Sequence, residues 1–121
     1  MSELLSIARQ LQDDAAREGF DWHELAPLWD KLAEEIAELR ETVDQTPARR
    51  QDELGDLLFV VVNLARHLGV DPAAALAGAN DKFRRRYAHV MAQPEGLPPL
   101  GSPERLDAME ARWQQAKKLG L

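Results

Sequence analysis

Three pairs of residues divide most of this chain into helices. In Thr46-Pro47, Asp71-Pro72 and Ser102-Pro103, a side chain that accepts hydrogen bonds stands directly before a proline. Such a side chain can cap the free N–H groups of a helix start, and proline suits the first helical position because it has no N–H to leave unpaired. Because no segment alternates apolar and polar residues as strands do, these pairs predict helices that begin near residues 47, 72 and 103.

Two more helices are predicted before the first of these pairs. Apolar residues recur at helical spacing between Leu4 and Ala15, and Gly19 is a typical residue to end a helix. Pro27 suits the first turn of a second helix, with Asp21 as its candidate cap. The expected helices cover residues 2–18, 27–44, 47–68, 72–91 and 103–118, and a proline-rich loop covers residues 93–103. The predicted fold class is all-α, a helical bundle of about five helices that forms a single domain over residues 1–121.

The composition excludes several classes of protein. The chain has 121 residues, no cysteine and a net charge of −6, which excludes disulfides and thiolate catalysis and argues against general nucleic-acid binding. The longest apolar run, Leu57–Val62, is far too short to cross a membrane, and the N-terminus lacks the basic and apolar segments of a secretory signal. We therefore expect a cytoplasmic protein whose partners include neither nucleic acid nor a membrane.

The third predicted helix carries acidic residues where a helix normally buries its sides. At about 100° per residue, Leu54 and Leu58 belong to one apolar stripe. Glu53 and Asp56 lie on a second face that also includes Val60, so this face is not the usual solvated one. A helix that is apolar nearly all round is buried nearly all round, and in so small a chain this indicates a partner subunit. We expect a homodimer or a dimer of dimers, with this helix at or near the interface.

The second predicted helix shows the same anomaly. Glu35 lies inside its apolar stripe, between Leu32 and Leu39, while Lys31 and Glu38 lie along the edge of that stripe. A carboxylate in a core stripe is costly unless it is paired or binds a metal. Glu35 is therefore the acid that most requires an explanation.

Packing of the second helix against the third would bring together four carboxylates, those of Glu35, Glu38, Glu53 and Asp56. Such groups repel one another at close range, and a hard divalent cation relieves this repulsion. Ligation by oxygen alone favours Mg²⁺, with Mn²⁺ as the other candidate. The spacing thus predicts a metal site built by these four residues.

Each acidic pair also has an ordinary explanation. The stretch EEIAELRE at residues 34–41 is typical of an exposed helix with Glu–Arg pairs at i,i+4, and composition and phase support that interpretation about as well as a metal site. A ferritin-like di-metal protein would need Glu-x-x-His, and none of the histidines has a glutamate three residues before it. A purely structural bundle stays open as an alternative, although it leaves Glu35 unexplained.

The C-terminal half holds candidate contacts for a phosphorylated ligand. Lys82 and Arg86 are i,i+4 neighbours, so their charges can converge on one polyanion, and arginine can bind phosphate oxygens in a bidentate manner. Trp113 could stack on a base of any kind. Taken alone, the basic pair is more typical of a solvated helix surface, and a lone tryptophan is more typical of a core.

A family resemblance connects these features. The stretch EEIAE at 34–38, followed by DELGD at 52–56, resembles the EExxE…ExxD signature of MazG-type nucleoside triphosphate pyrophosphohydrolases. The stretch ANDKFRRRY at 79–87 is similar to their NxKFxRR segment, and MEARWQQAKK at 109–118 is similar to their C-terminal helix. The resemblance covers nearly the whole chain in order, and it is to the catalytic domain standing by itself. Asp52 stands where glutamate is more usual in the family.

The resemblance implies an all-α dimer that binds Mg²⁺ and hydrolyses NTPs and dNTPs to the monophosphate and pyrophosphate, in housecleaning of the nucleotide pool. Carried over by position, the catalytic and metal-binding residues are Glu35, Glu38, Glu53 and Asp56. The implied substrate-binding residues are Lys31, Glu34, Asn80, Lys82, Arg86, Trp113 and Lys117. Among these, Glu34 supports the site, Lys82 and Arg86 bind the triphosphate, and Trp113 stacks on the base. The related phosphoribosyl-ATP pyrophosphohydrolases and dimeric dUTPases are the alternatives within enzymes.

Overall fold

The computed structural model describes residues 2–121, and this part of the chain is all-α, as the sequence predicts. Its five α-helices are α1 (Ser2–Arg17), α2 (Ala26–Glu41), α3 (Pro47–His67), α4 (Pro72–Val90) and α5 (Pro103–Lys118). A short 3-10 helix, η1 (Pro94–Gly96), lies within the predicted loop. Among the described residues no single helix is long and apolar enough to cross a membrane, and only α3 and α4 taken together pass that test, by length and composition.

The predicted caps are present at three helix starts. Thr46 Oγ1 accepts a hydrogen bond from the Arg49 N–H at 3.2 Å. Ser102 Oγ does the same for the Arg105 N–H at 3.2 Å. The Asp71 carboxylate accepts from the Ala73 N–H at 3.0 Å. These bonds satisfy N–H groups that a helix start leaves without a partner, so the three cap–proline pairs act as predicted.

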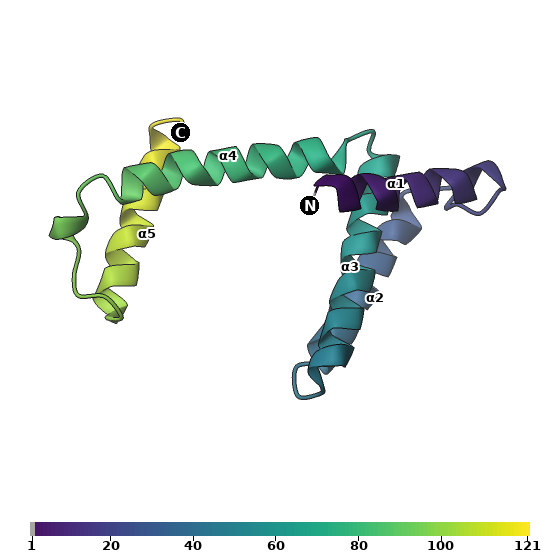
Figure 1. Cartoon of the computed structure of the whole chain (residues 1–121), viewed down its shortest axis with the longest axis horizontal. Helices are drawn as coiled ribbons and strands as arrows, with labels where there is room; N and C mark the ends of the chain where they lie inside the picture. The colour runs from purple at the N-terminus through teal and green to yellow at the C-terminus, as the bar shows by residue number, and fades with distance from the viewer. Residues whose placement is uncertain (1) are drawn as a thin grey trace. The chain divides into compact units, whose positions relative to one another are not determined.

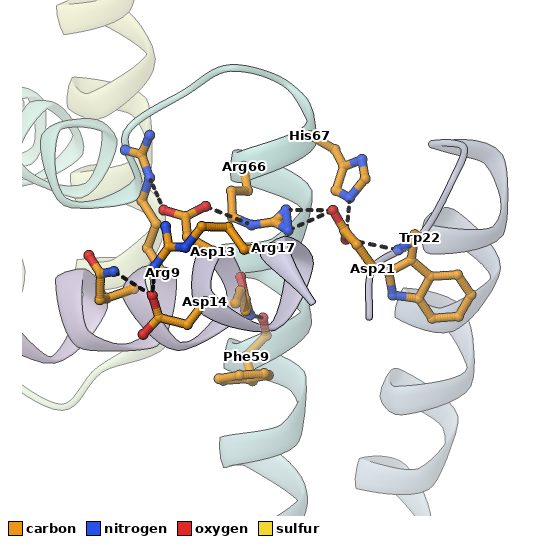
Figure 2. A network of polar contacts seen from close by, with 11 residues as sticks. Arg9, Asp13, Asp14, Arg17, Asp21, Trp22, Phe59, Arg66 and His67 are labelled. Atoms are coloured by element: carbon orange, nitrogen blue, oxygen red, sulfur yellow. Dashed lines mark hydrogen bonds and ion pairs between the residues drawn. The ribbon is translucent and has the colours of Figure 1, made fainter. Parts of the chain in front are cut away.

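The predicted cap of α2 is wrong. The N-cap residue is Leu25, which has no side-chain capping bond, and α2 ends at Glu41, three residues before the predicted end. Asp21 instead accepts hydrogen bonds from the Trp22 N–H and from Arg66 of α3, and it contacts His67, as Figure 2 shows. A long-range ion pair has therefore replaced a local cap, which sequence spacing alone does not reveal.

Residues up to Ala75 form one compact unit. Within it, α2 and α3 run side by side in opposite directions, and α1 crosses α3 towards the C-terminal end of that helix (Figure 1). Its core consists of Leu28 from α2 with Val60 and Leu64 from α3, against which Leu25 and Leu32 pack. The core therefore joins the two helices that carry the predicted acids.

Packing selects one face of each of these helices. On α2 the buried residues are Leu28 and Glu35, and Thr42 directly after the helix is also buried, so Glu35 does lie in the buried stripe, as predicted. On α3 the face with Glu53 and Val60 is buried, whereas the leucine stripe stays open, with Leu58 53% exposed. The prediction that this helix is buried nearly all round includes a partner subunit, so it stays a prediction.

Residues Leu76–Leu121 form a second compact unit, and the division falls within α4. In this unit, Phe83 of α4 packs against the Trp113 ring of α5 with ring centroids 5.5 Å apart. Arg112 donates hydrogen bonds to the carbonyl oxygens of Val90 and Gln93, which ties α5 to the end of α4. The single domain expected from the sequence stays a prediction.

Candidate metal and substrate site

Three of the four predicted ligands converge between α2 and α3. Glu35, Glu38 and Glu53 each offer an oxygen, and these oxygens lie within 4.8 Å of one another. Glu35 and Glu38 are one turn apart on α2, and antiparallel pairing with α3 sets Glu53 opposite them. Only 5% of Glu35 and 8% of Glu53 is exposed. The contact between these helices thus places two buried carboxylates and a half-buried one at one point.

Each buried carboxylate has one oxygen paired with a cation and one oxygen without a partner. Glu35 Oε1 lies 3.1 Å from Lys31 Nζ, and Glu53 Oε1 lies 3.4 Å from Arg49 Nη2. The second oxygens, Glu35 Oε2 and Glu53 Oε2, are buried and have no hydrogen-bond donor. Buried polar atoms normally have a hydrogen-bond partner, so two buried carboxylate oxygens without one indicate that a ligand binds here. A hard divalent cation with oxygen ligands fits this donor set.

The crowding of charge shows in the pKa values. The negative charge of Glu35 is the largest cause that raises the pKa of Glu38, and burial and the charge of Glu53 act in the same direction. The hydrogen bond of Lys31 with Glu35 is the largest cause that raises the pKa of Lys31, although burial opposes it. Repulsion among the acids is therefore only partly relieved by Lys31, and a bound cation would relieve it further.

Asp56, the fourth predicted ligand, belongs to a second group. Its carboxylate clusters with those of Asp52 and Glu53, and both aspartates are exposed. Glu53 is therefore common to the two groups. Asp52, which the sequence analysis gave no ligand role, stands four residues before Asp56, a spacing that places both on one side of α3.

The other predicted substrate residues lie in different surroundings. Exposed Glu34 pairs with Lys31 at 3.7 Å. The Arg86 guanidinium lies 5.5 Å from the centre of the Trp113 ring, and its Nε donates a hydrogen bond to the Leu121 carbonyl oxygen. Three more residues are exposed in the second unit: Asn80, Lys82 and Lys117. Lys82, Arg86 and Trp113 thus share one unit, and their roles towards a substrate stay predictions.

A cavity of 470 Å³ lies beside the acidic cluster in the first unit. Its lining includes the aromatic residues Phe20, Trp22 and Phe59, the amides Gln12 and Asn63, and Lys31. Since Lys31 also contacts Glu35, the cavity and the acids are neighbours. Nothing in the sequence predicts that Gln12 and Asn63 line a cavity, because a single polar residue in a helix does not indicate what a neighbouring helix will place against it.

Known proteins resemble this chain along most of its length. The family model described as the MazG nucleotide pyrophosphohydrolase domain matches residues 24–91. The chain is 44% identical over 121 residues to the nucleoside triphosphate pyrophosphohydrolase of Escherichia coli (strain K12), covering 94% of this chain and 44% of that protein. It is 38% identical over 115 residues to the nucleoside triphosphate pyrophosphohydrolase/pyrophosphatase MazG of Thermotoga maritima, covering 93% of this chain and 44% of that protein. The chain thus spans less than half the length of either relative.

Proposed function

We propose that this chain, which belongs to the MazG nucleotide pyrophosphohydrolase family, hydrolyses nucleoside triphosphates to the monophosphate and pyrophosphate. The observation that carries the proposal is the group formed by Glu35, Glu38 and Glu53, in which two buried oxygens have no donor. Both relatives are named as nucleoside triphosphate pyrophosphohydrolases, and their similarity extends over nearly the whole of this chain, which supports the same reaction.

The acidic residues fit a divalent cation, for which we propose Mg²⁺, with Mn²⁺ as a substitute. Glu35, Glu38 and Glu53 would hold it, together with Asp56 through the group that shares Glu53. When bound, such a cation neutralises charge on phosphate oxygens and makes a bound water more acidic.

The residues of the chain supply the remaining parts of the reaction. A carboxylate of the acidic group orients the attacking water and accepts its proton as the water oxygen bonds to the α-phosphorus. The bond from that phosphorus to the bridging oxygen breaks, and pyrophosphate leaves with the electron pair. Lys31 holds Glu35 in place at 3.1 Å. Lys82 and Arg86 would bind the phosphates as they leave, because cations stabilise the charge that develops there.

The assembly and the cellular setting are further parts of the proposal. The open leucine stripe of α3, with Leu54 and Leu58 about half exposed, supports a homodimer or a dimer of dimers built on this helix. A cytoplasmic enzyme that removes unwanted nucleotides from the pool would suit this chemistry. Asn80 and Lys117 are proposed to assist binding of the triphosphate, and Glu34 to support Lys31.

The reaction is tested by product analysis with the purified chain. Incubation with a panel of NTPs and dNTPs, with Mg²⁺ and with a chelator, is followed by anion-exchange chromatography. We expect a nucleoside monophosphate and pyrophosphate from several substrates, and only with the metal. Formation of the diphosphate and orthophosphate would contradict the proposal, and so would an absence of turnover across the whole panel. The exposed acid Asp30, near the start of α2 and eight residues before Glu38, serves as the control through Asp30→Asn, which should leave turnover unchanged.

A further inference from the structure

The turn between α1 and α2, residues 18–25, forms one wall of the cavity beside the acidic group. Its aromatic residues Phe20 and Trp22 line the cavity, yet Phe20 is 83% exposed and Trp22 is 39% exposed. Packing within the chain therefore leaves both rings largely open and does not by itself fix where they lie. Because Lys31 lines the same cavity and contacts Glu35, the place of these rings matters to any ligand that extends from the acidic group into the cavity.

A single carboxylate holds this turn on α3. Among the described residues, Asp21 makes the only hydrogen bonds and ion pairs between the turn and that helix, through Arg66 and His67 (Figure 2). In the described part of the chain, residues 21–24 take part in no backbone–backbone hydrogen bond. The polar contacts that place this turn on α3 therefore all pass through one side chain.

The donors around Asp21 fill both oxygens of its carboxylate. Oδ1 accepts a hydrogen bond from the Trp22 N–H at 2.8 Å and contacts His67 Nε2 at 3.0 Å. Oδ2 lies 2.8 Å from Arg66 Nη2 and 3.2 Å from Arg66 Nη1. An ionised carboxylate has about four acceptor positions and no donor, so all of them are occupied and His67 carries a proton on Nε2. The bond from the Trp22 N–H also fixes the backbone that carries one of the aromatic rings.

Arg66 provides a fixed partner for Asp21. Its side chain is 10% exposed, and its Nε lies 3.3 Å from an oxygen of Asp13 on α1. The guanidinium group is planar, so ion pairs at Nε and at the terminal nitrogens set its orientation. Through Arg66, the turn is therefore held against both α1 and α3.

We infer that Asp21 is a positioning residue for substrate binding, which keeps Phe20 and Trp22 in place by holding the turn on α3. The inference rests on the proposed function and deepens it. A substrate whose phosphates lie at the acidic group extends past Lys31 into the cavity, so its nucleoside end meets this turn. A turn that is already fixed loses less conformational freedom when the substrate binds, which favours affinity. Asp21 acts through the turn and not on the reacting phosphate, so it affects binding and not the chemical step.

Asp21→Asn tests the inference in the whole chain, with the NTP that the product panel shows to be hydrolysed best. Asparagine keeps one acceptor oxygen and places an N–H₂ group against the donors of Arg66 and His67, so part of the contact with α3 is lost. We expect KM to rise by about tenfold, because the turn must then become ordered as the substrate binds. We expect kcat to stay within about twofold of the wild-type value. A variant that is only less stable contains less folded enzyme, which lowers the apparent kcat and leaves KM unchanged.

Inorganic triphosphate, added with Mg²⁺ as a competitor, distinguishes the two ends of the substrate. It offers phosphates to the acidic group and has no nucleoside to enter the cavity. We expect Asp21→Asn to leave its inhibition constant unchanged while KM for the NTP rises. An equal rise in both constants would overturn the inference, because Asp21 would then act on the phosphate end. If triphosphate does not inhibit the wild type, KM alone decides.

Two substitutions of His67 test the same contact without removing the carboxylate. His67→Gln can still donate an N–H to Asp21, whereas His67→Leu cannot. We expect His67→Leu to raise KM and His67→Gln to keep it near the wild-type value. The matched control is Asp14→Asn, which removes an exposed carboxylate of α1 that pairs with Gln10 and Arg17 of the same helix. This control should leave KM unchanged.

The outcomes separate this inference from the proposed function. An absence of pyrophosphate release by the wild type across the whole panel contradicts the function itself. Release with an unchanged KM in a folded Asp21→Asn variant contradicts only the positioning role. Thermal melting shows whether each variant is folded at the assay temperature. Should Asp21→Asn not fold, the two His67 variants decide the question, and equal KM values in both would overturn the inference.

Discussion

Substitution of Glu35 distinguishes the two interpretations of the acidic residues, because a metal ligand and an ordinary helix-surface residue should give different results. We expect Glu35→Gln to keep or raise the melting temperature of the metal-free protein, because it removes repulsion with Glu38 and Glu53. The same change should abolish stabilisation by Mg²⁺ and reduce turnover by more than about a hundredfold, which exceeds the loss typical of residues that only support a ligand. Thermal melting with and without Mg²⁺, alongside pyrophosphate release, measures both effects.

The control for that experiment is an acid on the same helix. Asp30→Asn changes an exposed side chain near the start of α2 and should alter neither the response to Mg²⁺ nor turnover. Lys31 also contacts Glu34, at 3.7 Å, so neutral Glu35 does not leave it without a carboxylate. A Glu35→Gln variant with the wild-type rise in melting temperature on adding Mg²⁺ would remove Glu35 from the site.

Asp21 is a second residue whose charge matters, this time for folding. Burial raises the pKa of Asp21, but the hydrogen bond with His67, the bond from the Trp22 N–H and the charge of Arg66 together hold it below its ordinary value. Arg66 Nη2 lies 2.8 Å from Asp21 Oδ2, and its Nε lies 3.3 Å from Asp13 of α1 (Figure 2). The carboxylate therefore helps to join α1, α3 and the turn before α2.

The lowered pKa sets the sign of a pH dependence. The folded-state pKa of Asp21 lies below its unfolded value, so its stabilisation is complete above the ordinary value of 3.8 and is lost as the pH falls through the folded value. We expect Asp21→Asn to lower the free energy of unfolding by about 1–3 kcal/mol at neutral pH. Urea unfolding at falling pH should show that the difference in unfolding free energy between the wild type and Asp21→Asn becomes smaller below pH 3.8, the ordinary pKa of the carboxyl group. A difference in unfolding free energy that stays constant with pH would contradict this role. The control is Asp81→Asn, which changes an exposed ion pair with Arg84.

At the scale of the elements, the start of α3 supports the acidic group. Thr46 caps this helix through the Arg49 N–H, and Arg49 and Glu53 follow within the first two turns. We expect Thr46→Ala to cost about 1 kcal/mol of unfolding free energy, and Thr46→Gly to cost only a few tenths of this amount, because glycine tolerates the cap position. Denaturant unfolding of both variants distinguishes the loss of a capping bond from a change in helix propensity. Helix propensity alone would make glycine more destabilising than alanine. A larger cost for glycine than for alanine would contradict the capping role.

At the scale of the whole molecule, the open apolar surface of α3 predicts assembly. Leu58 is 53% exposed, and Leu54 and Val61 on the same helix are 46% and 44% exposed. We expect light scattering at micromolar concentration to give at least twice the mass of one chain, because burial of such a stripe favours association. Leu58→Glu should shift the protein towards the monomer by placing a charge in the interface.

A leucine elsewhere gives the control for assembly. Leu100 is 87% exposed in the loop before α5, and Leu100→Glu should leave the measured mass unchanged. A wild-type chain that is well folded and monomeric under these conditions would contradict the proposed dimer. A loss of assembly in Leu100→Glu alone would place the interface away from α3.

The sequence by itself determined the helices and the chemistry of their acids. Caps such as Thr46 and Ser102 act on N–H groups within a few residues, so spacing alone was enough to predict them. The same holds for the presence of Glu35 in a buried stripe, because helical phase depends only on the local chain.

Only the tertiary structure decided which faces meet. It packed the Glu53 face of α3 against α2 and left the leucine stripe open, it drew Asp21 to Arg66 instead of the start of α2, and it turned the Gln12 amide towards Phe59. Each of these contacts joins residues far apart in the chain. Which partner a residue contacts depends on burial, ion pairing and hydrogen bonding across helices, and a local sequence pattern does not contain these energies. They outweigh the conformational preference of a single residue.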